Sequence, residues 1–586
     1  MRLVKLDVVG EYKSIKGTID VPFTYTFGES FNEFNPLCLV GLNGSGKSNF
    51  IELLADIFGF ADRFFNPQYE SKNDLPYNFY LEYLITGGDV TRRVLLQCNN
   101  SQLQMFFMEN DEPQLVTSDY LEMLPTNVIA YSSGQNQGLS SVFAKTQFQY
   151  YEVIRKQGVF YREYRLRYDN VLATEDGEND SIWKNLSTYV KSKYEAENGL
   201  FKVPRAYLDD VDSYFEFPEE PLESVSASLP IGLFTDHSLN NLVFVYLMVC
   251  RGVNKNKSKS FRRFVSKEAN ITGFCSFDVD LRLAQYRDFE TVGNIVERLI
   301  ELSADSQQLP TQSCPSSFNK DTLTGVLHFK INKHFYNSFK LLYLDETIFL
   351  EHLITLNHLT AKRWSHDEKR TLKTDKYERN VPNVAGGLMP MRIMNIKIKY
   401  RKLGIETLYD RLSDGEHQLI QLIGSLILFD HQQTLFILDE PESHFNPEWR
   451  MEFIELIDNY VNTKNIELLI STHSPFILSA CESGRVLHFQ KDETGNIEIK
   501  GVDLKTYGAS FDTLLTSVFD LDVLISKKPL QEIREILSEY DTEEISDEAA
   551  LDKLEPFGDS FELNFRRNKI RNKIAEKSIV NGQGED

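Results

Sequence analysis

The chain has 586 residues, a formal net charge of −23 at pH 7 and 41% hydrophobic residues, a content typical of a folded protein. An acidic balance of this size argues against a protein that coats nucleic acid with its whole surface, although it is compatible with a local basic groove. The six cysteines are scattered, with no Cys-x-x-Cys pair and no histidine at zinc-finger spacing, so neither a structural zinc site nor a disulfide framework is expected.

The apolar segments are short for a membrane protein. The first residues lack the charged and then apolar pattern of a signal peptide. The longest apolar stretches, Leu242 to Cys250 and Leu419 to Phe429, fall short of the roughly 18 residues that span a bilayer. We therefore expect a cytoplasmic protein without membrane contact.

Residues 1–145 are expected to be rich in strands, with one strong helix. Their main motif is Gly41-Leu42-Asn43-Gly44-Ser45-Gly46-Lys47-Ser48, which lies between the apolar strand Pro36 to Val40 and a helix that starts near Asn49. This order and spacing are those of a phosphate-binding P-loop. Its glycines let backbone N–H groups surround a triphosphate, Lys47 reaches the β- and γ-phosphates, and Ser48 offers its hydroxyl to Mg²⁺. The predicted nucleotide-binding residues are Gly41, Asn43, Gly44, Ser45, Gly46, Lys47, Ser48 and Asn49.

A second buried strand, Asn127 to Tyr131, ends in a polar turn that contains a glycine. A glutamine at such a strand end can sense a γ-phosphate and its metal ion. Gln135 is the candidate metal-site residue here, with Gln137 as the alternative, and a plain turn explains the pattern equally well.

Residues 146–388 form a long, mainly helical middle region without a fixed-period repeat or sustained heptads. The chain is therefore expected to lack long coiled-coil arms. Ser303 to Ser317 is expected to be an exposed loop. Periodicity predicts helices at Ile182 to Glu195, Leu239 to Cys250, Phe289 to Leu302 and Glu346 to Leu359, and strands at Phe274 to Leu283 and Gly325 to Ile331.

The next segment, residues 389–503, contains a capped helix start. Leu412 to Gln418 precedes the apolar helix Leu419 to Phe429, and Ser413 and Glu416 have the S-x-x-E spacing of a capping box. The amides at this helix start lie beside Gly415. They either simply begin the helix or hold a phosphate.

Two further apolar strands end in polar residues. Leu435 to Leu438 leads into Asp439 and Glu440, at the tip of a parallel strand that we expect beside the P-loop. A carboxylate there can anchor Mg²⁺ through water, and the adjacent carboxylate can polarise the attacking water. Ile466 to Thr472 delivers His473, which is either structural or a γ-phosphate contact.

Together these residues resemble the ABC-type ATPases, in the branch that includes RecF, the SMC proteins and related double-strand-break repair ATPases. In that family the motifs are named Walker A (Gly41 to Ser48), signature (Leu412 to Gln418), Walker B (Leu435 to Glu440), D-loop (Glu442 to Asn446) and H-loop (His473). The resemblance implies an α/β fold: a two-lobed P-loop ATPase head with a long, mainly helical insertion and a helical C-terminal extension at residues 504–586.

The family resemblance also implies roles for these residues. Two heads would enclose two ATP molecules, each held by Walker A of one protomer and by the signature of the other. Ser413, Gly415 and Glu416 would form the signature contact in trans. Glu440 would be the general base and His473 the γ-phosphate sensor, with Mg²⁺ at Ser48, Asp439 and Gln135. Asp414 and Glu416 stand where transporters carry Gly and Gln, a departure usual in the subgroup that this chain most resembles.

The runs Leu438 to Pro447 and Ser471 to Leu478 resemble the bacterial ATPases encoded beside restriction and anti-phage genes, above all the PtuA-like ATPases of Septu and retron systems. In that subgroup the ATPase assembles with an HNH nuclease. The region after Asp503 is short, acidic and mostly helical, whereas OLD-type relatives carry a Toprim nuclease domain there. Intrinsic nuclease activity is therefore not expected, and the C-terminal extension is a candidate docking site for an effector.

Four stretches that combine basic and aromatic residues are the candidates for contact with DNA or RNA. A stretch of this kind is more often a solvated helix face. The four stretches are Arg155 to Tyr168, Lys255 to Lys267, Lys362 to Arg379 and Arg566 to Lys577.

Three functions compete: a defence ATPase that controls a partner nuclease, a DNA-repair clamp, and the nucleotide-binding subunit of a transporter. The third is disfavoured because residues 49–411 separate Walker A from the signature, far more than a transporter subunit needs. The sequence favours the defence ATPase, with the DNA-repair clamp as the alternative.

Overall fold

A computed structural model describes most of the chain in two compact units, Met1–Ala509 and Ser510–Asp586, which we treat separately. The described residues are 1–28, 34–69, 75–87, 90–109, 112–133, 137–173, 179–196, 222, 227–235, 237–252, 255–287, 289–309, 317–373, 388–400, 406–430, 433–464, 466–492, 495–521 and 525–582.

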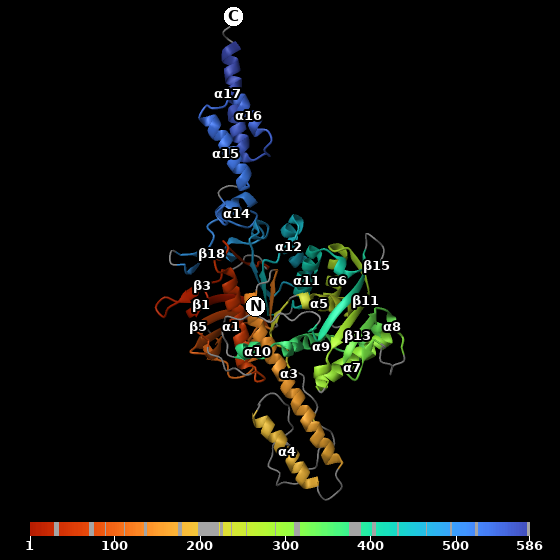
Figure 1. The fold of residues 1–586 in the computed structure, drawn as a ribbon. Helices are drawn as coiled ribbons and strands as arrows, with labels where there is room; N and C mark the ends of the chain where they lie inside the picture. Colours follow the sequence, from red (N-terminus) through yellow and green to blue (C-terminus); the bar gives the residue numbers. More distant parts are fainter. Residues whose placement is uncertain are drawn as a thin grey trace. The chain divides into compact units, whose positions relative to one another are not determined.

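A seven-stranded central sheet organises the first unit (Figure 1). All neighbouring strands in it are parallel except β19, which runs antiparallel to β18. Every residue of β4, β16 and β17 is buried, which explains their continuous apolar sequences. In spatial order the strands are β10 (Gly232–Phe234), β9 (Asn127–Ser132), β16 (Thr434–Asp439), β17 (Ile466–Ser471), β4 (Leu37–Gly41), β18 (Val486–Lys491) and β19 (Ile497–Lys500).

An antiparallel sheet packs with the central sheet around helix α1 (Lys47–Phe65). One hydrophobic core joins α1 to residues of both sheets, including Leu6 and Leu81 on one side and Leu39 and Ile437 on the other. The sheet has the order β2-β1-β5-β6-β7-β8, with β3 also paired to β1. Its strands are β1 (Arg2–Tyr12), β2 (Ile15–Gly17), β3 (Phe23–Thr26), β5 (Tyr77–Gly87), β6 (Val90–Asn99), β7 (Gln102–Glu109) and β8 (Glu112–Leu115), followed by the short helix α2 (Tyr120–Met123).

A third sheet crosses the boundary that we expected between residues 388 and 389. Strands β11 (Ile271–Arg282) and β13 (Thr324–Lys330) come from the middle region, and β11 pairs with β14 (Met391–Tyr400) of the following segment. The edge strands are β12 (Phe318–Asn319) and β15 (Glu406–Leu408). The middle region also adds β10 to the central sheet, so it is built into the head rather than appended to it.

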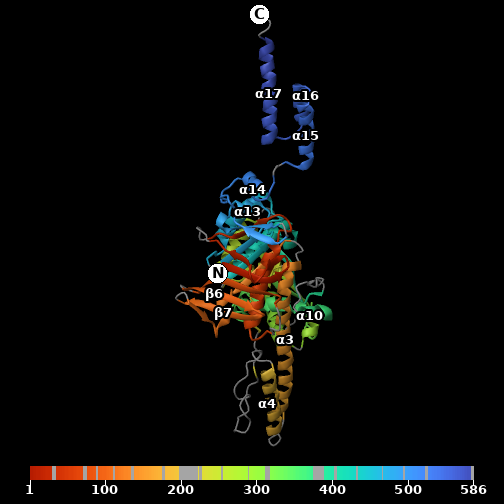
Figure 2. The same ribbon diagram turned by 90° about the vertical axis from the view of Figure 1, so that its left-hand side faces the viewer.

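The four predicted helices of the middle region are confirmed, and four others in its described part were not predicted. The longest of the missed helices, α3 (Gln137–Leu172), has 36 residues, with α4 (Asn179–Ala196) running alongside it (Figures 1 and 2). Its buried tyrosine and phenylalanine residues, mixed with charges, hide the helical period. The other helices here are α5 (His237–Val249), α6 (Lys255–Lys267), α7 (Glu290–Ser306), α8 (Lys333–Leu342), α9 (Thr347–His358) and α10 (His366–Lys373). Helix α7 extends into the loop expected at 303–317, of which residues 310–316 lie outside the described part.

The remaining helices of the first unit follow the second half of the motifs. Helix α11 (Asp414–Leu428) packs against α5, α6 and α12 (Pro447–Tyr460), and α13 (Pro475–Leu478) follows the H-loop. Among the described residues, no helix combines the length and the apolar composition that a bilayer crossing requires.

The second unit is helical and has its own small core. Its helices are α14 (Phe511–Ser517), α15 (Lys527–Asp541), α16 (Asp547–Leu554) and α17 (Phe561–Gly582). The core consists of Ile533, Ala550, Leu554, Leu563 and Ile570.

Candidate nucleotide-binding and hydrolysis site

The predicted P-loop connects β4 to α1 and has a backbone that requires glycine. Gly41, Gly44 and Gly46 have φ angles of 143°, 76° and 103°, in the region that other residues rarely adopt. A Cβ atom at Gly41 would lie 2.3 Å from the carbonyl oxygen of Phe489, and one at Gly46 would lie 2.0 Å from Cδ1 of Ile497. The loop therefore runs in close contact with β18 and β19.

Lys47 is the buried cation of this loop. Its Nζ donates to the carbonyl oxygens of Gly41, at 2.9 Å, and Leu42, at 3.2 Å, and only 5% of the residue is exposed. Burial lowers the pKa of Lys47, and the nearby charges of Glu440 and Asp439 oppose this shift. The ammonium group thus lies inside the curve of the loop, where phosphate oxygens could replace the two carbonyl groups.

Parallel strands bring the other predicted residues to the same edge as the P-loop. Asp439 at the end of β16 is in register with Ser471 of β17, and Ser471 is in register with Leu39 of β4. Strand β17 lies between β16 and the P-loop strand β4. The intervening strand is the one that delivers His473, so His473 follows a strand adjacent to both motifs.

Glu440 and His473 face each other at this edge. Glu440 adopts φ 48°, and its backbone N–H donates to the carbonyl oxygen of Ser471 at 2.9 Å. Its Oε1 lies 3.7 Å from Nε2 of His473, and about half of its side chain is exposed. Burial is the main cause that lowers the pKa of His473, and the positive charge of Lys47 lowers it further. The negative charge of Asp439 raises this pKa and partly offsets the two effects. At neutral pH the imidazole is therefore mainly uncharged and has one N–H to donate.

The donor set fits Mg²⁺ bound together with phosphates. Among the described residues, no three His, Cys, Asp or Glu side chains cluster as metal ligands. Ser48 and the buried Asp439 instead offer single oxygen atoms, and Mg²⁺ commonly takes one or two protein oxygens plus phosphate and water. Gln135 lies outside the described residues. Gln137 begins α3, and nothing is described of its side chain.

The predicted capping box of the signature helix is confirmed. The N–H of Glu416 donates to Oγ of Ser413 at 3.3 Å, and Oε2 of Glu416 accepts from the N–H of Ser413 at 2.9 Å. Oε1 of Glu416 also accepts from the hydroxyl of Tyr400 at 3.2 Å. Glu416 therefore stabilises the start of α11, whereas Ser413 lies exposed at the surface.

Sequence reasoning missed two buried polar residues around the D-loop. Gln418 donates from Nε2 to the carbonyl oxygen of Pro441 at 2.7 Å and accepts at Oε1 from the N–H of His444 at 3.1 Å. Glu442 accepts from the hydroxyl of Thr472, which itself accepts from the N–H of Ser474 at 2.9 Å. The sequence did contain a signal for Gln418: it is a polar residue directly before the apolar run Leu419 to Phe429 of α11. A polar residue at such a position indicates a buried side chain with hydrogen-bond partners.

Glu442 should make stability depend on pH. Burial raises its pKa from 4.5 to about 7, and its Oε2 is buried without a hydrogen-bond partner among the described residues. The folded protein thus keeps the carboxyl protonated at pH values where the unfolded chain ionises it. This contribution to stability is intact below pH 4.5 and is lost as the pH rises through about 7. The loss lowers the free energy of unfolding by about 3 kcal/mol.

We therefore expect Glu442→Gln to match the wild type in free energy of unfolding near pH 4.5 and to exceed it by about 3 kcal/mol at pH 8. Equilibrium urea denaturation at both pH values checks this. A difference between the two proteins that is the same at both pH values would contradict a protonated Glu442.

Many side chains of the four basic stretches already have partners. Arg155 pairs with Glu152, Lys257 pairs with Asp430 at 2.7 Å, and the guanidinium of Arg567 donates to the carbonyl oxygens of Leu554 and Phe557. Such residues stabilise the fold, so composition overstates the basic surface. Residues 374–379 lie outside the described part. Exposed basic residues include Arg162, Arg165, Lys259, Arg263, Lys569 and Arg571.

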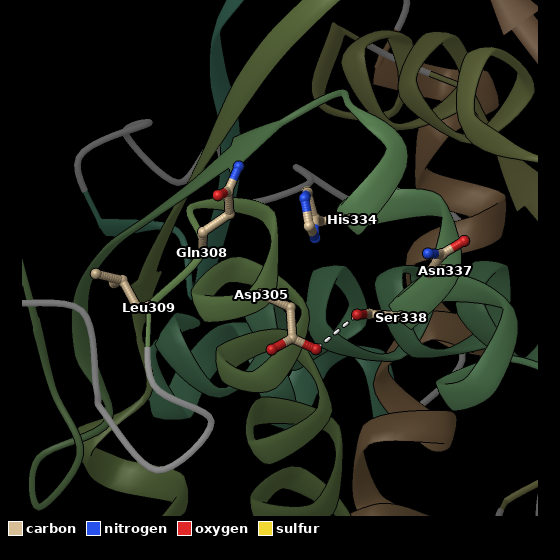
Figure 3. A pocket seen from close by; sticks show the side chains of 6 residues that line it. All are labelled: Asp305, Gln308, Leu309, His334, Asn337 and Ser338. Atoms are coloured by element: carbon tan, nitrogen blue, oxygen red, sulfur yellow. Dashed lines mark hydrogen bonds between the residues drawn. The ribbon is translucent and has the colours of Figure 1, made fainter.

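A polar pocket of about 340 Å³ lies away from the predicted residues, between the end of α7 and helix α8 (Figure 3). One hydrogen bond crosses it, from Oγ of Ser338 to Oδ2 of Asp305 at 2.5 Å. None of the predicted nucleotide-binding or catalytic residues lines it. Its lining residues are Asp305, Gln308, Leu309, His334, Asn337 and Ser338.

Residues 320–479 match the family described as "AAA domain, putative AbiEii toxin, Type IV TA system". The match contains the signature, Walker B and H-loop residues. The chain is 21% identical over 262 residues to the Septu protein PtuA of Bacillus thuringiensis, covering 41% of this chain and 60% of that protein. It is 26% identical over 113 residues to the protein ea59 of Escherichia phage lambda, covering 19% of this chain and 21% of that protein.

These relatives are matched over less than two thirds of their own lengths. Among solved structures, the SMC head domain from Thermotoga maritima aligns at 12% identity with a TM-score of 0.30, over 86% of this chain and all of that one. The predicted resemblance to ABC-type ATPases, including PtuA-like proteins, is confirmed. The predicted α/β class is confirmed by the sheets and helices of the first unit, which are followed by a helical C-terminal unit.

Proposed function

We propose that this chain binds ATP with Mg²⁺ and hydrolyses it, and that two heads close around two nucleotides to control a partner nuclease in an anti-phage defence complex. The observation that carries the hydrolysis step is the meeting of Lys47, Glu440 and His473 at one edge of the parallel sheet. A glycine-rich loop, a base and a neutral donor are the groups that phosphoryl transfer to water requires.

Each residue has a distinct role in this proposal. Lys47 and the P-loop amides hold the β- and γ-phosphates, and Ser48 and Asp439 would hold Mg²⁺, which offsets the phosphate charge. The half-exposed carboxylate of Glu440 takes the proton from the attacking water. The imidazole of His473 donates its N–H to the γ-phosphate. Because the pKa of His473 is lowered, the imidazole makes this hydrogen bond in its uncharged form.

The regulatory part of the proposal comes from the family resemblance and from the match to PtuA. Two copies would bring Ser413 and Gly415 of one head to the γ-phosphate bound by the other. ATP binding would close the dimer and hydrolysis would open it, and the middle region and the C-terminal unit would pass this change to an HNH-type effector.

The alternative function is a DNA-repair or recombination clamp. Expression of the tagged chain with its native flanking genes, followed by purification and mass spectrometry, separates the two. A nuclease in fixed proportion to this chain is the expected result. Elution of the chain alone or with DNA, with hydrolysis that DNA stimulates, would favour the clamp.

A further inference from the structure

The D-loop segment, residues 440–446, consists of the predicted D-loop (Glu442 to Asn446) and the two residues before it, and side chains from three other parts of the chain hold it. Gln418 of α11 binds its backbone at Pro441 and His444. Thr472, next to the H-loop histidine, binds the carboxyl group of Glu442. Ser133, which follows β9, shares a hydrogen bond of 2.8 Å with Ser443. The segment therefore links the signature helix to the strand ends that carry Glu440 and His473.

Gln418 makes the most constrained of these links. The residue is only 5% exposed, and its amide uses its N–H₂ and its oxygen on two different backbone groups of the same turn. One turn earlier on α11, a Cβ atom at Gly415 would lie 2.8 Å from the carbonyl oxygen of His444. The first turn of α11 and the D-loop segment are thus in direct contact.

This contact has an energetic consequence. Loss of the Gln418 amide would leave the carbonyl group of Pro441, a buried residue, and the N–H of His444 without this partner. Unpaired backbone groups are costly, so the segment would move to satisfy them. Pro441 directly follows Glu440, and such a movement would therefore displace the carboxylate that faces His473.

We infer that Gln418 is a positioning residue, which couples the start of the signature helix to the geometry of Glu440 through the D-loop backbone. The inference rests on the proposed hydrolysis of ATP. Gln418 touches neither nucleotide nor attacking water in this scheme. A shift of α11, which carries Ser413 at its start, would move Pro441 through the Gln418 amide and so change the position of the Glu440 carboxylate.

The test compares Gln418→Met with Gln421→Met. Gln421 lies three residues on in the same helix and is equally buried, but its Nε2 donates to the carbonyl oxygen of Thr235, at 3.4 Å, rather than to the D-loop. We expect Gln418→Met to lower kcat by about 10–100-fold with KM within about twofold of the wild type, because a small misplacement of a catalytic group has effects of this size. Gln421→Met should keep kcat within about threefold.

A second readout needs no activity. Hydrogen exchange of the peptide that contains His444 should be faster in Gln418→Met and unchanged in Gln421→Met. If Gln418→Met does not fold, Gln418→Glu replaces it, since the carboxylate keeps the acceptor for His444 and loses the donor to Pro441. A kcat within about twofold of an active wild type would overturn the inference. An inactive wild type would instead contradict the proposed function. Exchange at His444 that is the same in Gln418→Met and the wild type would refute the contact itself, whether or not the wild type is active.

Discussion

Replacing Glu440 with glutamine should lower the rate of ATP hydrolysis by about 10²–10⁴-fold while ATP binding persists. Glutamine keeps the size of the side chain and cannot take a proton from water. The bonds of Lys47 to the loop and the backbone bond from Glu440 to Ser471 do not involve the carboxylate, so the nucleotide site should stay intact. Bound ATP would then persist, and dimers should accumulate on a sizing column in the presence of ATP and Mg²⁺.

The matched control is Glu448→Gln. Glu448 is an exposed acid in the first turn of α12, eight positions along the chain, and its loss changes the net charge by the same amount. It should hydrolyse ATP at the wild-type rate. Wild-type turnover by Glu440→Gln would show that another group acts as the base.

Replacing Lys47 with alanine should weaken ATP binding by at least about 100-fold. The reason is the loss of charge-assisted hydrogen bonds to phosphate, each of which is worth about 1.5–3 kcal/mol. Titration calorimetry with a slowly hydrolysed ATP analogue measures the effect directly. Because dimerisation is proposed to follow ATP binding, this variant should also remain monomeric when ATP is added.

Lys257→Ala is the control for removal of a buried lysine. Burial also lowers the pKa of Lys257, and its ammonium pairs with Asp430 and donates to the carbonyl oxygen of Leu428. Its loss should reduce thermal stability and leave the affinity for ATP unchanged. Equal losses of affinity in both variants would mean that Lys47 acts only through the fold, against its assignment as a phosphate ligand.

Three variants separate the parts of the proposed cycle. Lys47→Ala removes binding, Glu440→Gln removes the chemical step, and Gln418→Met weakens the link between the signature helix and that step. Because Gln418 and Glu440 act on the same turn of backbone, their effects should not add. The double variant should be no slower than Glu440→Gln alone.

The sequence by itself determined those parts of this protein that depend on neighbouring residues. The P-loop from Gly41 to Ser48, the capping box of Ser413 and Glu416, and the acids at the end of β16 are all short-range patterns, in which local geometry follows from residue type. The same holds for the helices α5, α7 and α9, whose apolar spacing is visible along the chain.

Only the tertiary structure decided what depends on residues that are distant in the sequence. The bonds of Gln418 to the D-loop join positions 23 and 26 residues apart, and the bond between Thr472 and Glu442 joins positions 30 apart. No local pattern encodes such pairs, nor the placement of β17 between β4 and β16. The basic stretches illustrate the same limit: composition counts their cations, but packing decides which of them are neutralised, because an ion pair such as Lys257 with Asp430 forms only once the chain has folded.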